Sequence, residues 1–256
     1  VLQAQGLSVA ERRRIAEWMT GTVLLGPAAD APMKGRCRHP APPINNPLRG
    51  AHWDGWGVDG DNGRFQPTSK AGLKAADVST LKLKWAFGFP GATNAFAQPT
   101  VAAGRVFVGG DTGAVYALDA KTGCTYWVFQ AAAAVRSAVV IGKSSRVRGG
   151  ALAYFGDVKA NVYAIDARTG ELFWIQKADE HRVGRVTASP TLVNGILYVP
   201  VSGVGEEGSV GNPNYECCTF RGSIMAFDAG TGRPEWKAWA ITDEPKQTGT
   251  RPNGVK

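Results

Sequence analysis

The sequence lacks several features that mark common classes of protein. None of its apolar runs approaches the ~18 residues of a transmembrane helix, and its N-terminus does not have the pattern of a secretory signal peptide. We expect the chain to begin inside a domain, so the missing signal peptide excludes no compartment. Histidine is scarce, and His39, which lies close to Cys37, has no second pair of metal ligands nearby. A metal site is therefore not predicted at this position.

Acidic residues are fewer than basic ones, which gives the 256-residue chain a formal net charge of +8. Only Arg12, Arg13 and Arg14 are consecutive, and the other Lys and Arg residues are scattered through expected turns and strand edges, where they discourage edge pairing. This pattern favours a solvated basic surface, suited to an acidic protein partner, over binding to nucleic acid.

The most informative feature that is present is a short motif that occurs three times. In each copy a glycine lies four residues after an aspartate and a tryptophan lies eight after it. Residues before the aspartate alternate as in a half-buried strand, and Asp-x-x-Thr-Gly favours a turn. Each copy is therefore predicted to be a β-hairpin whose tryptophan packs against a large flat surface. The copies are Asp119-Ala-Lys-Thr-Gly123 with Trp127, Asp166-Ala-Arg-Thr-Gly170 with Trp174, and Asp228-Ala-Gly-Thr-Gly232 with Trp236.

The aspartates of the three copies lie 47 and 62 residues apart (119 to 166, and 166 to 228). Four short strands with their turns need roughly 40 to 50 residues, which is the period of a β-propeller blade. The chain is therefore predicted to be all-β, with blades at residues 97–130, 135–177 and 184–239. The longer third unit needs an insertion, and Asn194-Gly195 predicts a tight hairpin turn within it.

Residues 7–21 are the only segment with a convincing helical pattern. A capping box precedes an apolar stripe that is formed by Ile15, Trp18 and Met19. The segment resembles the last helix of a c-type cytochrome domain, which implies haem c in an upstream part, because the chain has no Cys-x-x-Cys-His motif. Met19 is more typical of a core residue than of an axial haem ligand. We assign residues 1–22 to this domain and the Pro-rich residues 23–50 to a semi-rigid linker.

Residues 51–66, which include Trp53-Asp-Gly-Trp56 and Asn62-Gly-Arg64-Phe65, resemble the opening segment of pyrroloquinoline quinone (PQQ) dehydrogenases. Residues 81–85 alternate as a strand ending in a tryptophan and are interpreted as the outer strand of a neighbouring blade. The three motifs resemble the tryptophan-docking repeats of eight-bladed quinoprotein propellers. The order of helix, linker and propeller is most similar to the polyvinyl alcohol dehydrogenase group, in which haem c and PQQ share one chain. This resemblance implies that residues 51–256 form about three of eight blades, and that the chain is a fragment.

The resemblance also implies cofactor contacts at the propeller axis. Arg136, at the start of an inner strand, suits a carboxylate or quinone oxygen, with an ion pair between blades as the alternative. Thr187 and Ser202 match positions where the family places hydroxyl groups against PQQ. Glu206 or Glu207 matches the region that supplies a carboxylate to Ca²⁺, with a solvated loop as the alternative. No catalytic residue is assigned, because the family's base lies in later blades outside this chain.

Cys217 and Cys218 are adjacent, and a bond between them would form a strained, flat ring, because neighbouring Cα atoms lie only about 3.8 Å apart. Methanol dehydrogenase-like enzymes place such a vicinal disulfide over PQQ, followed by an arginine. Arg221 follows here, although the register differs from theirs. We predict the vicinal bond and treat all three residues as candidate cofactor contacts, with stiffening of a loop as the alternative. The pairing then left is Cys37 with Cys124, which would tie the linker to the first blade, and two free thiols are the alternative.

Taken together, the resemblance implies a periplasmic, PQQ-dependent alcohol oxidoreductase that passes electrons to cytochrome c. Its substrate would be polyvinyl alcohol or another secondary alcohol, and disulfides suit a periplasmic location. Because the expected base lies elsewhere, the chain alone is not expected to turn over substrate. The alternative is a non-catalytic propeller that serves as a scaffold for protein assembly. The cytochrome-like helix and the Cys217-Cys218 pair argue against that alternative, because a scaffold needs neither.

Overall fold

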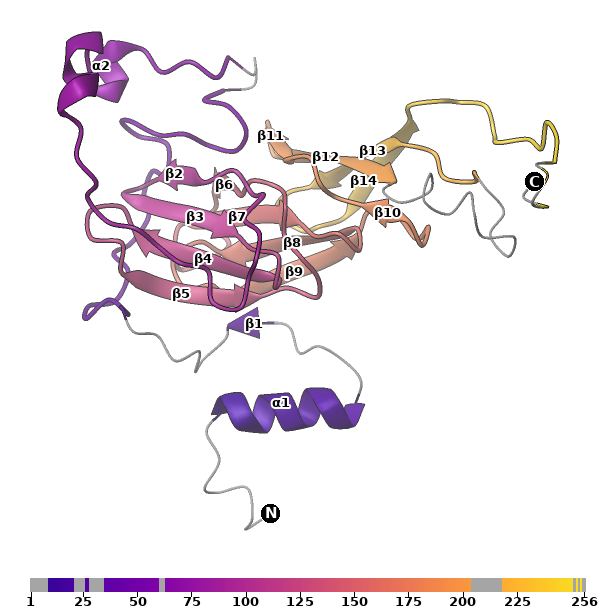
Figure 1. The fold of residues 1–256 in the computed structure, drawn as a ribbon, viewed down its shortest axis with the longest axis horizontal. Coiled ribbons are helices and arrows are strands. Elements are labelled where there is room, and N and C mark those ends of the chain that lie inside the picture. The colour runs from indigo at the N-terminus through magenta and orange to yellow at the C-terminus, as the bar shows by residue number, and fades with distance from the viewer. Residues whose placement is uncertain are drawn as a thin grey trace.

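The computed structural model describes residues 9–20, 26–27, 35–59, 63–203 and 218–250, together with Pro252 and Gly254. Three antiparallel sheets follow one another along the chain and lie side by side (Figure 1). The first sheet has the order β1-β5-β4-β3-β2, the second β6-β7-β8-β9 and the third β10-β12-β13-β14, with β11 also paired to β12. The predicted blades are confirmed, and the fold is a partial β-propeller.

The strands of the first sheet are β1 (Gly26–Pro27), β2 (Thr100–Ala102), β3 (Arg105–Gly109), β4 (Ala114–Asp119) and β5 (Thr125–Gln130). Those of the second are β6 (Val140–Lys143), β7 (Ala151–Gly156), β8 (Asn161–Asp166) and β9 (Leu172–Lys177). Those of the third are β10 (Gly184–Arg185), β11 (Thr191–Val193), β12 (Ile196–Gly203), β13 (Ser223–Asp228) and β14 (Pro234–Trp239). The helical segments are α1 (Val9–Thr20), α2 (Thr68–Ala71) and the 3-10 helix η2 (Ala75–Thr80).

The core consists of layers between the sheets. Phe107 and Phe129 of the first sheet pack in one cluster with Phe155 and Tyr163 of the second. A second cluster joins the second sheet to the third and includes Trp174 and Phe227. The outer face of the first sheet is covered by a segment that contains Trp85, Phe87 and Phe89. Apolar side chains therefore bury both faces of the first two sheets, which is what a stack of blades requires.

The repeated Asp-x-x-Thr-Gly segment forms the predicted turn. In the first copy the Asp119 carboxylate accepts hydrogen bonds from the backbone N–H of Lys121 (3.0 Å) and of Thr122 (2.8 Å). The N–H of Gly123 then donates to the Asp119 carbonyl at 2.8 Å. Gly123 has a φ of +73°, which favours glycine. The predicted Asn194-Gly195 turn is also confirmed, with φ angles of +49° and +80°.

Two of the three repeated tryptophans lie between blades. Trp127 and Trp174 are 5% and 8% exposed. The indole N–H of Trp127 donates to the Ala167 carbonyl at 3.2 Å, and its ring lies so close to Gly170 that a Cβ there would be 2.9 Å from it. Trp174 repeats this arrangement on the third blade, where its N–H donates to the Ala229 carbonyl at 3.0 Å. The predicted docking role is confirmed for both.

Trp236, in the third copy, is 46% exposed, and no further sheet within the described residues packs against it. Trp85 precedes the first sheet and docks on it in the way that Trp127 and Trp174 dock on the blades that follow them. Its indole N–H donates to the Ala120 carbonyl at 3.2 Å. The strand predicted for residues 81–85 is wrong, since the structure assigns none there and Leu81 and Leu83 are exposed. No neighbouring strand lies beside this segment in the part of the chain that the structure describes.

The linker follows the outer edges of the first two blades. Cys37 forms the predicted disulfide with Cys124, and the Cys37 N–H donates to the Thr125 carbonyl at 3.0 Å. Ile44 is buried, with 1% exposure. The guanidinium group of Arg168 donates to the Ala41 carbonyl at 3.0 Å. The proline-rich segment is therefore packed along the propeller over these residues.

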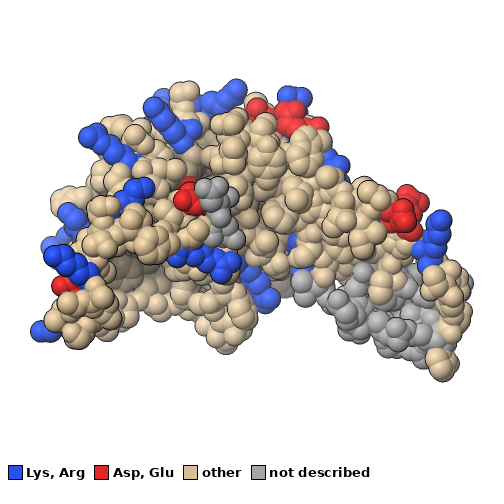
Figure 2. Space-filling model, turned by 90° about the horizontal axis from the view of Figure 1, so that it is seen from above, with Lys and Arg blue, Asp and Glu red and all other residues tan. Residues whose placement is uncertain are grey.

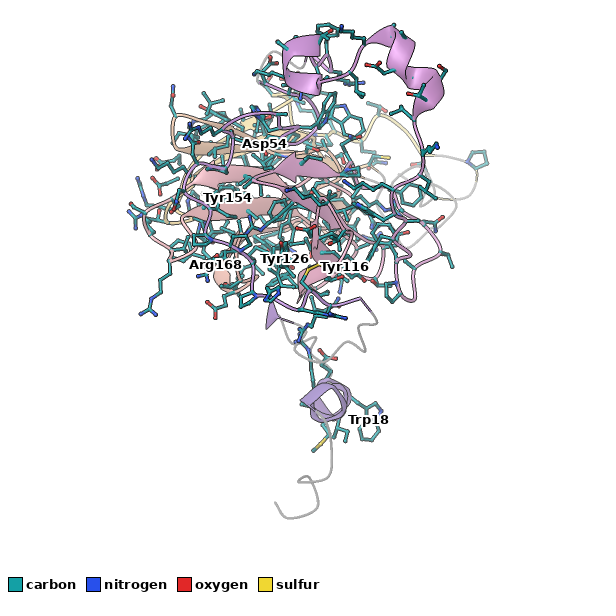
Figure 3. All side chains as sticks on the ribbon, turned by 90° about the vertical axis from the view of Figure 1, so that its left-hand side faces the viewer. Trp18, Asp54, Tyr116, Tyr126, Tyr154 and Arg168 are labelled. Atoms are coloured by element: carbon teal, nitrogen blue, oxygen red, sulfur yellow. A yellow bond between two sulfur atoms is a disulfide. The ribbon has the colours of Figure 1, made fainter. Side chains whose placement is uncertain are left out.

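Helix α1 confirms the helix predicted at residues 7–21 and stands clear of the sheets (Figure 1). Its apolar stripe is exposed, at 45% for Ile15, 85% for Trp18 and 72% for Met19, and Figure 3 shows Trp18 directed away from the sheets. The insertion of the third unit falls between β12 and β13, where residues 204–217 lie outside the described part. No helix among the described residues is both long and apolar enough to cross a bilayer. Figure 2 shows the Lys and Arg side chains of one face scattered rather than gathered in a single patch.

Candidate functional site

Three of the predicted cofactor contacts flank the inner strands β6 and β11 and the neighbouring β12, which lie close together in Figure 1. Arg136 precedes β6, and Thr187 precedes β11. Ser202 lies near the end of β12, which pairs antiparallel with β11. In an antiparallel sheet the start of one strand meets the end of its neighbour. The topology therefore places these three residues at the same end of the propeller.

The structure brings Thr187 and Ser202 together. Their hydroxyl oxygens lie 3.0 Å apart, and both residues are partly buried. The pairing of Arg185 with Ser202 across β10 and β12 sets this proximity. Each hydroxyl has one donor and two acceptor positions. The pair therefore keeps hydrogen-bonding capacity for a polar ligand after its mutual bond is made.

Arg136 lies against the preceding blade. Its Nε atom is 3.4 Å from Oδ1 of Asp111, which belongs to the turn between β3 and β4. Its guanidinium carbon is 4.5 Å from the centre of the Phe96 ring. The alternative interpretation, an ion pair between blades, therefore describes the observed contact. The Nε atom is buried against Asp111 and makes no hydrogen bond to the described residues, whereas the side chain as a whole is 40% exposed and can reach a further acceptor.

Arg221 is held by the segment that follows the third blade. Its guanidinium donates to the Thr242 carbonyl at 2.9 Å and lies 4.2 Å from the centre of the Trp239 ring. It also approaches the Glu244 carboxylate at 3.9 Å. Arg221 therefore contacts residues that follow the third blade, which the sequence analysis did not predict. Its contact with the cofactor stays a prediction.

Four residues of the predicted site belong to the segment between β12 and β13. Cys218 is exposed and disulfide-bonded. Cys217, Glu206 and Glu207 lie outside the described residues. The vicinal disulfide and the calcium ligands therefore stay predictions. Within the described ranges there is no group of three His, Cys, Asp or Glu side chains that could hold a metal ion.

Residues 53–55, which we call the inner strap, run along the inner edges of the first two blades. Trp53 exchanges two backbone hydrogen bonds with Val101, each of 2.8 Å. The next residue, Asp54, accepts a hydrogen bond from the N–H of Ile141 through Oδ1 at 2.8 Å. The strap therefore occupies backbone groups that the edge strands β2 and β6 would otherwise leave unpaired.

A cavity of about 790 Å³ lies beside the inner strap. It is bounded by residues 48–59, by β6 of the second blade and by residues 187–193 of the third. Thr187 belongs both to this cavity and to the hydroxyl pair with Ser202. Volumes of 300–1,000 Å³ with mainly apolar walls and a few polar groups are typical of small-molecule sites. The apolar walls include Leu48, Trp56, Val58, Val140, Pro190, Leu192 and Val193, and the polar ones Asp54, Asp59, Thr187, Ser189 and Thr191.

Asp54 is the electrostatically unusual residue of this cavity. Burial raises its pKa from 3.8 to about 7, and the hydrogen bond from the N–H of Ile141 offsets this only in part. Figure 3 shows Asp54 on the side of the sheets opposite to α1. The sequence analysis missed this residue although it lies within the Trp53-Asp-Gly-Trp56 segment. Nothing in that pattern marks the carboxylate as buried, because its burial depends on blades that are distant in sequence.

The described residues fit a planar, oxygen-rich cofactor. PQQ, as implied by the family resemblance, carries carboxylates and quinone carbonyls, which are acceptors. The Thr187–Ser202 pair keeps one hydroxyl donor besides its mutual hydrogen bond, and Arg136 supplies a partly exposed guanidinium whose Nε faces Asp111. Guanidinium groups match carboxylates in geometry as well as in charge. These three residues would hold such a group at the end of the inner strands.

Comparison with known proteins was informative over most of the chain. Residues 43–250 match the model of a family of PQQ-type propeller repeats whose description is outer membrane protein assembly factor BamB. The chain is 40% identical to a polyvinylalcohol dehydrogenase from a Pseudomonas species, over 94% of this chain and 39% of that protein. It is 32% identical to the quinoprotein alcohol dehydrogenase PedH from Pseudomonas putida, over 72% of this chain and 29% of that protein. The chain thus spans at most about two fifths of the length of these relatives.

Among solved structures, the chain resembles the quinohemoprotein alcohol dehydrogenase ADHIIG from Pseudomonas putida HK5. The TM-score is 0.60 at 26% sequence identity, and the match covers 80% of this chain and 29% of that one. This likeness agrees with the three-blade architecture described above.

Proposed function

Because the chain belongs to this PQQ-type family, we propose that it is part of a PQQ-dependent alcohol oxidoreductase. The observation that carries the proposal is the 40% identity to a polyvinylalcohol dehydrogenase over 94% of the chain. The hydroxyl pair and the guanidinium at the propeller axis support it, because they lie where the cofactor of this family is expected.

Three residues have roles in this proposal. One hydroxyl of the mutually hydrogen-bonded pair Thr187 and Ser202 donates to an oxygen atom of the cofactor. Arg136 pairs with one of its carboxylates, while Phe96 and Asp111 keep the guanidinium in place. When bound, PQQ supplies the two-electron oxidant that an alcohol substrate requires. Polyvinyl alcohol or another secondary alcohol is the proposed substrate.

The finer assignments are also proposals. Glu206 or Glu207 supplies a carboxylate to Ca²⁺, and Cys217, Cys218 and Arg221 contact the cofactor. The catalytic base lies in later blades, and electrons leave to cytochrome c through a haem c domain upstream of α1. The enzyme works in the periplasm, where the Cys37–Cys124 disulfide would be stable.

A fluorescence titration tests the proposal, because Trp residues near a bound quinone are quenched. We expect saturable quenching of the chain by PQQ with Ca²⁺. The Arg136→Gln variant should bind PQQ about tenfold more weakly, since it loses a charge-assisted hydrogen bond. Arg233→Gln is the matched control. The Arg233 side chain is 69% exposed and pairs with Glu235, so this variant should bind PQQ as the unmodified chain does.

The other function to consider is a scaffold for protein assembly, which the description of the matching family favours. A scaffold would keep the docking repeats without binding a cofactor. Absence of quenching in the chain, together with absence of dye-linked alcohol oxidation by a longer form with all its blades, would favour the scaffold. Equal weakening by Arg136→Gln and Arg233→Gln would contradict the role of Arg136.

A further inference from the structure

The cavity beside the inner strap has a chemical character that the cofactor contacts do not explain. Its walls combine branched aliphatic side chains with hydroxyl groups and one partly buried carboxyl group, that of Asp54. Leu192, Val140 and Val58 can contact a hydrocarbon chain, while Thr191 and Ser189 can contact hydroxyl groups spaced along it. A ligand that matches these walls alternates methylene and hydroxyl-bearing carbons.

Asp54 provides the main acceptor in this cavity. Its Oδ1 atom is already occupied by the N–H of Ile141 at 2.8 Å. Its Oδ2 atom accepts no hydrogen bond from the described residues, so it is available to a ligand hydroxyl. A hydrogen bond between a hydroxyl and a buried carboxylate is stronger than one between neutral groups, because the surroundings screen it less.

The charges at the cavity favour a neutral ligand over an organic cation. Trp56 would be the natural ring for a cation, but the guanidinium of Arg64 already lies 5.3 Å from its centre. The second carboxylate, Asp59, is exposed at the rim. The cavity therefore offers one partly buried acceptor and several hydroxyls rather than an anionic cage.

We propose that this cavity binds a short 1,3-diol segment of an aliphatic chain, with Asp54 accepting a hydrogen bond from one hydroxyl and Thr191 contacting the next. The proposal rests on the proposed alcohol oxidoreductase function and adds a site for the part of the substrate that does not react. Because Thr187 borders both the cavity and the cofactor contacts, a chain bound here extends towards the cofactor end of the propeller.

The test is a calorimetric titration of the chain with pentane-2,4-diol, without PQQ and at about pH 8.5, which is above the pKa of about 7 for Asp54, so that its carboxylate is ionised. We expect saturable binding that Asp54→Asn weakens about tenfold and Thr191→Val about fivefold, as expected for losing an ionic or a neutral hydrogen-bond partner. Asp243→Asn changes an exposed carboxylate that does not line the cavity, and it should bind the diol as the unmodified chain does. Circular dichroism checks that each variant is folded. If Asp54→Asn does not fold, Thr191→Val still tests the proposal.

Three outcomes would overturn the proposal. The first is no saturable binding of the diol. The second is unchanged binding in both Asp54→Asn and Thr191→Val. The third is tighter binding of butylammonium than of the diol, lost in Asp54→Asn, which would assign the cavity to cations. Diol binding without PQQ binding would leave the cavity assignment standing while the proposed oxidoreductase function failed, so the two failures are distinguishable.

Discussion

Single polar side chains decide how the inner edges of these blades are joined. The Thr100 hydroxyl accepts from the N–H of Gly55 at 3.1 Å and donates to the Val139 carbonyl of the next blade. The Ser189 hydroxyl accepts from the N–H of Ala138 at 2.9 Å. Such bonds satisfy backbone groups that no strand pairs, and leaving one of them buried without a partner costs about 1–3 kcal/mol. Asp54 likewise accepts a hydrogen bond from the N–H of Ile141, but its side chain is ionisable, unlike those of Thr100 and Ser189.

The raised pKa of Asp54 makes stability depend on pH. The folded chain holds the proton up to a pH of about 7, whereas the unfolded chain releases it near 3.8. The folded state therefore binds more protons in this window, and the free energy of unfolding falls as pH rises through it. The loss is at most about 4 kcal/mol, from about 1.4 kcal/mol per pKa unit. Urea unfolding between pH 4 and pH 8 measures it.

The Asp54→Asn variant keeps an acceptor for Ile141 and removes the charge. We expect it to gain stability relative to the unmodified chain as pH rises from 4 to 7, with a constant difference above that. Asp243→Asn, at an exposed position, controls for the substitution itself. A difference between Asp54→Asn and the unmodified chain that does not change with pH would contradict the buried-carboxyl account.

At the scale of elements, the linker behaves as part of the first two blades. Strand β1 pairs with β5, at the edge opposite to β2. The Arg105 side chain is 2% exposed, and its guanidinium donates to the carbonyls of Pro42 and Ala103. A buried guanidinium needs such partners because charge is costly to desolvate. These contacts fix the path of the chain between α1 and the propeller over its described residues.

The Cys37–Cys124 disulfide closes a loop with a sequence separation of 87 residues. Loop-closure entropy predicts that removing such a link costs about 4.6 kcal/mol in the free energy of unfolding. We expect the Cys37→Ser, Cys124→Ser double variant to show this loss in urea unfolding, together with faster proteolysis within residues 35–47. A loss below about 1 kcal/mol would mean that the hydrogen bonds and Ile44 already hold the linker.

At the scale of the whole molecule, one interaction is repeated from blade to blade. Trp85, Trp127 and Trp174 each donate an indole hydrogen bond to the alanine that follows the repeated aspartate of the next blade. Each ring also lies on the glycine of that repeat. Trp236 carries the same motif but is 46% exposed. The chain therefore presents one unused copy of the interaction that joins its own blades.

This difference predicts unequal costs for the same substitution. Trp174→Ala should destabilise the chain by about 3–5 kcal/mol, because it leaves a cavity between the second and third blades. Trp236→Ala should cost less than about 1 kcal/mol, since its indole is half exposed. In a longer chain with a further blade packed on Trp236, we expect its cost to rise to that of Trp174. Equal costs of both variants in the chain described here would contradict the docking account.

Much of the fold could be predicted because its signals are local. The turn of Asp119-x-x-Thr-Gly123 depends on side-chain bonds within five residues, and Asn194-Gly195 needs only its own backbone preference. The repetition of the motif then predicted blades, since each hairpin needs a neighbour for its tryptophan. Residues 81–85 were predicted wrongly as a strand because alternation favours a strand only where a partner strand is available.

The sequence by itself therefore determined the hairpins and the series of blades. It predicted the Cys37–Cys124 pairing only on condition that Cys217 and Cys218 pair, and the structure contains the Cys37–Cys124 bond. Only the tertiary structure decided that Thr187 meets Ser202, that Arg136 lies against Asp111, and that Asp54 lies partly buried beside a cavity. The physical reason is that a turn is stabilised by bonds between near neighbours in sequence. A site at the propeller axis exists only where inner strands from different blades converge, and no local pattern records which side chains meet there.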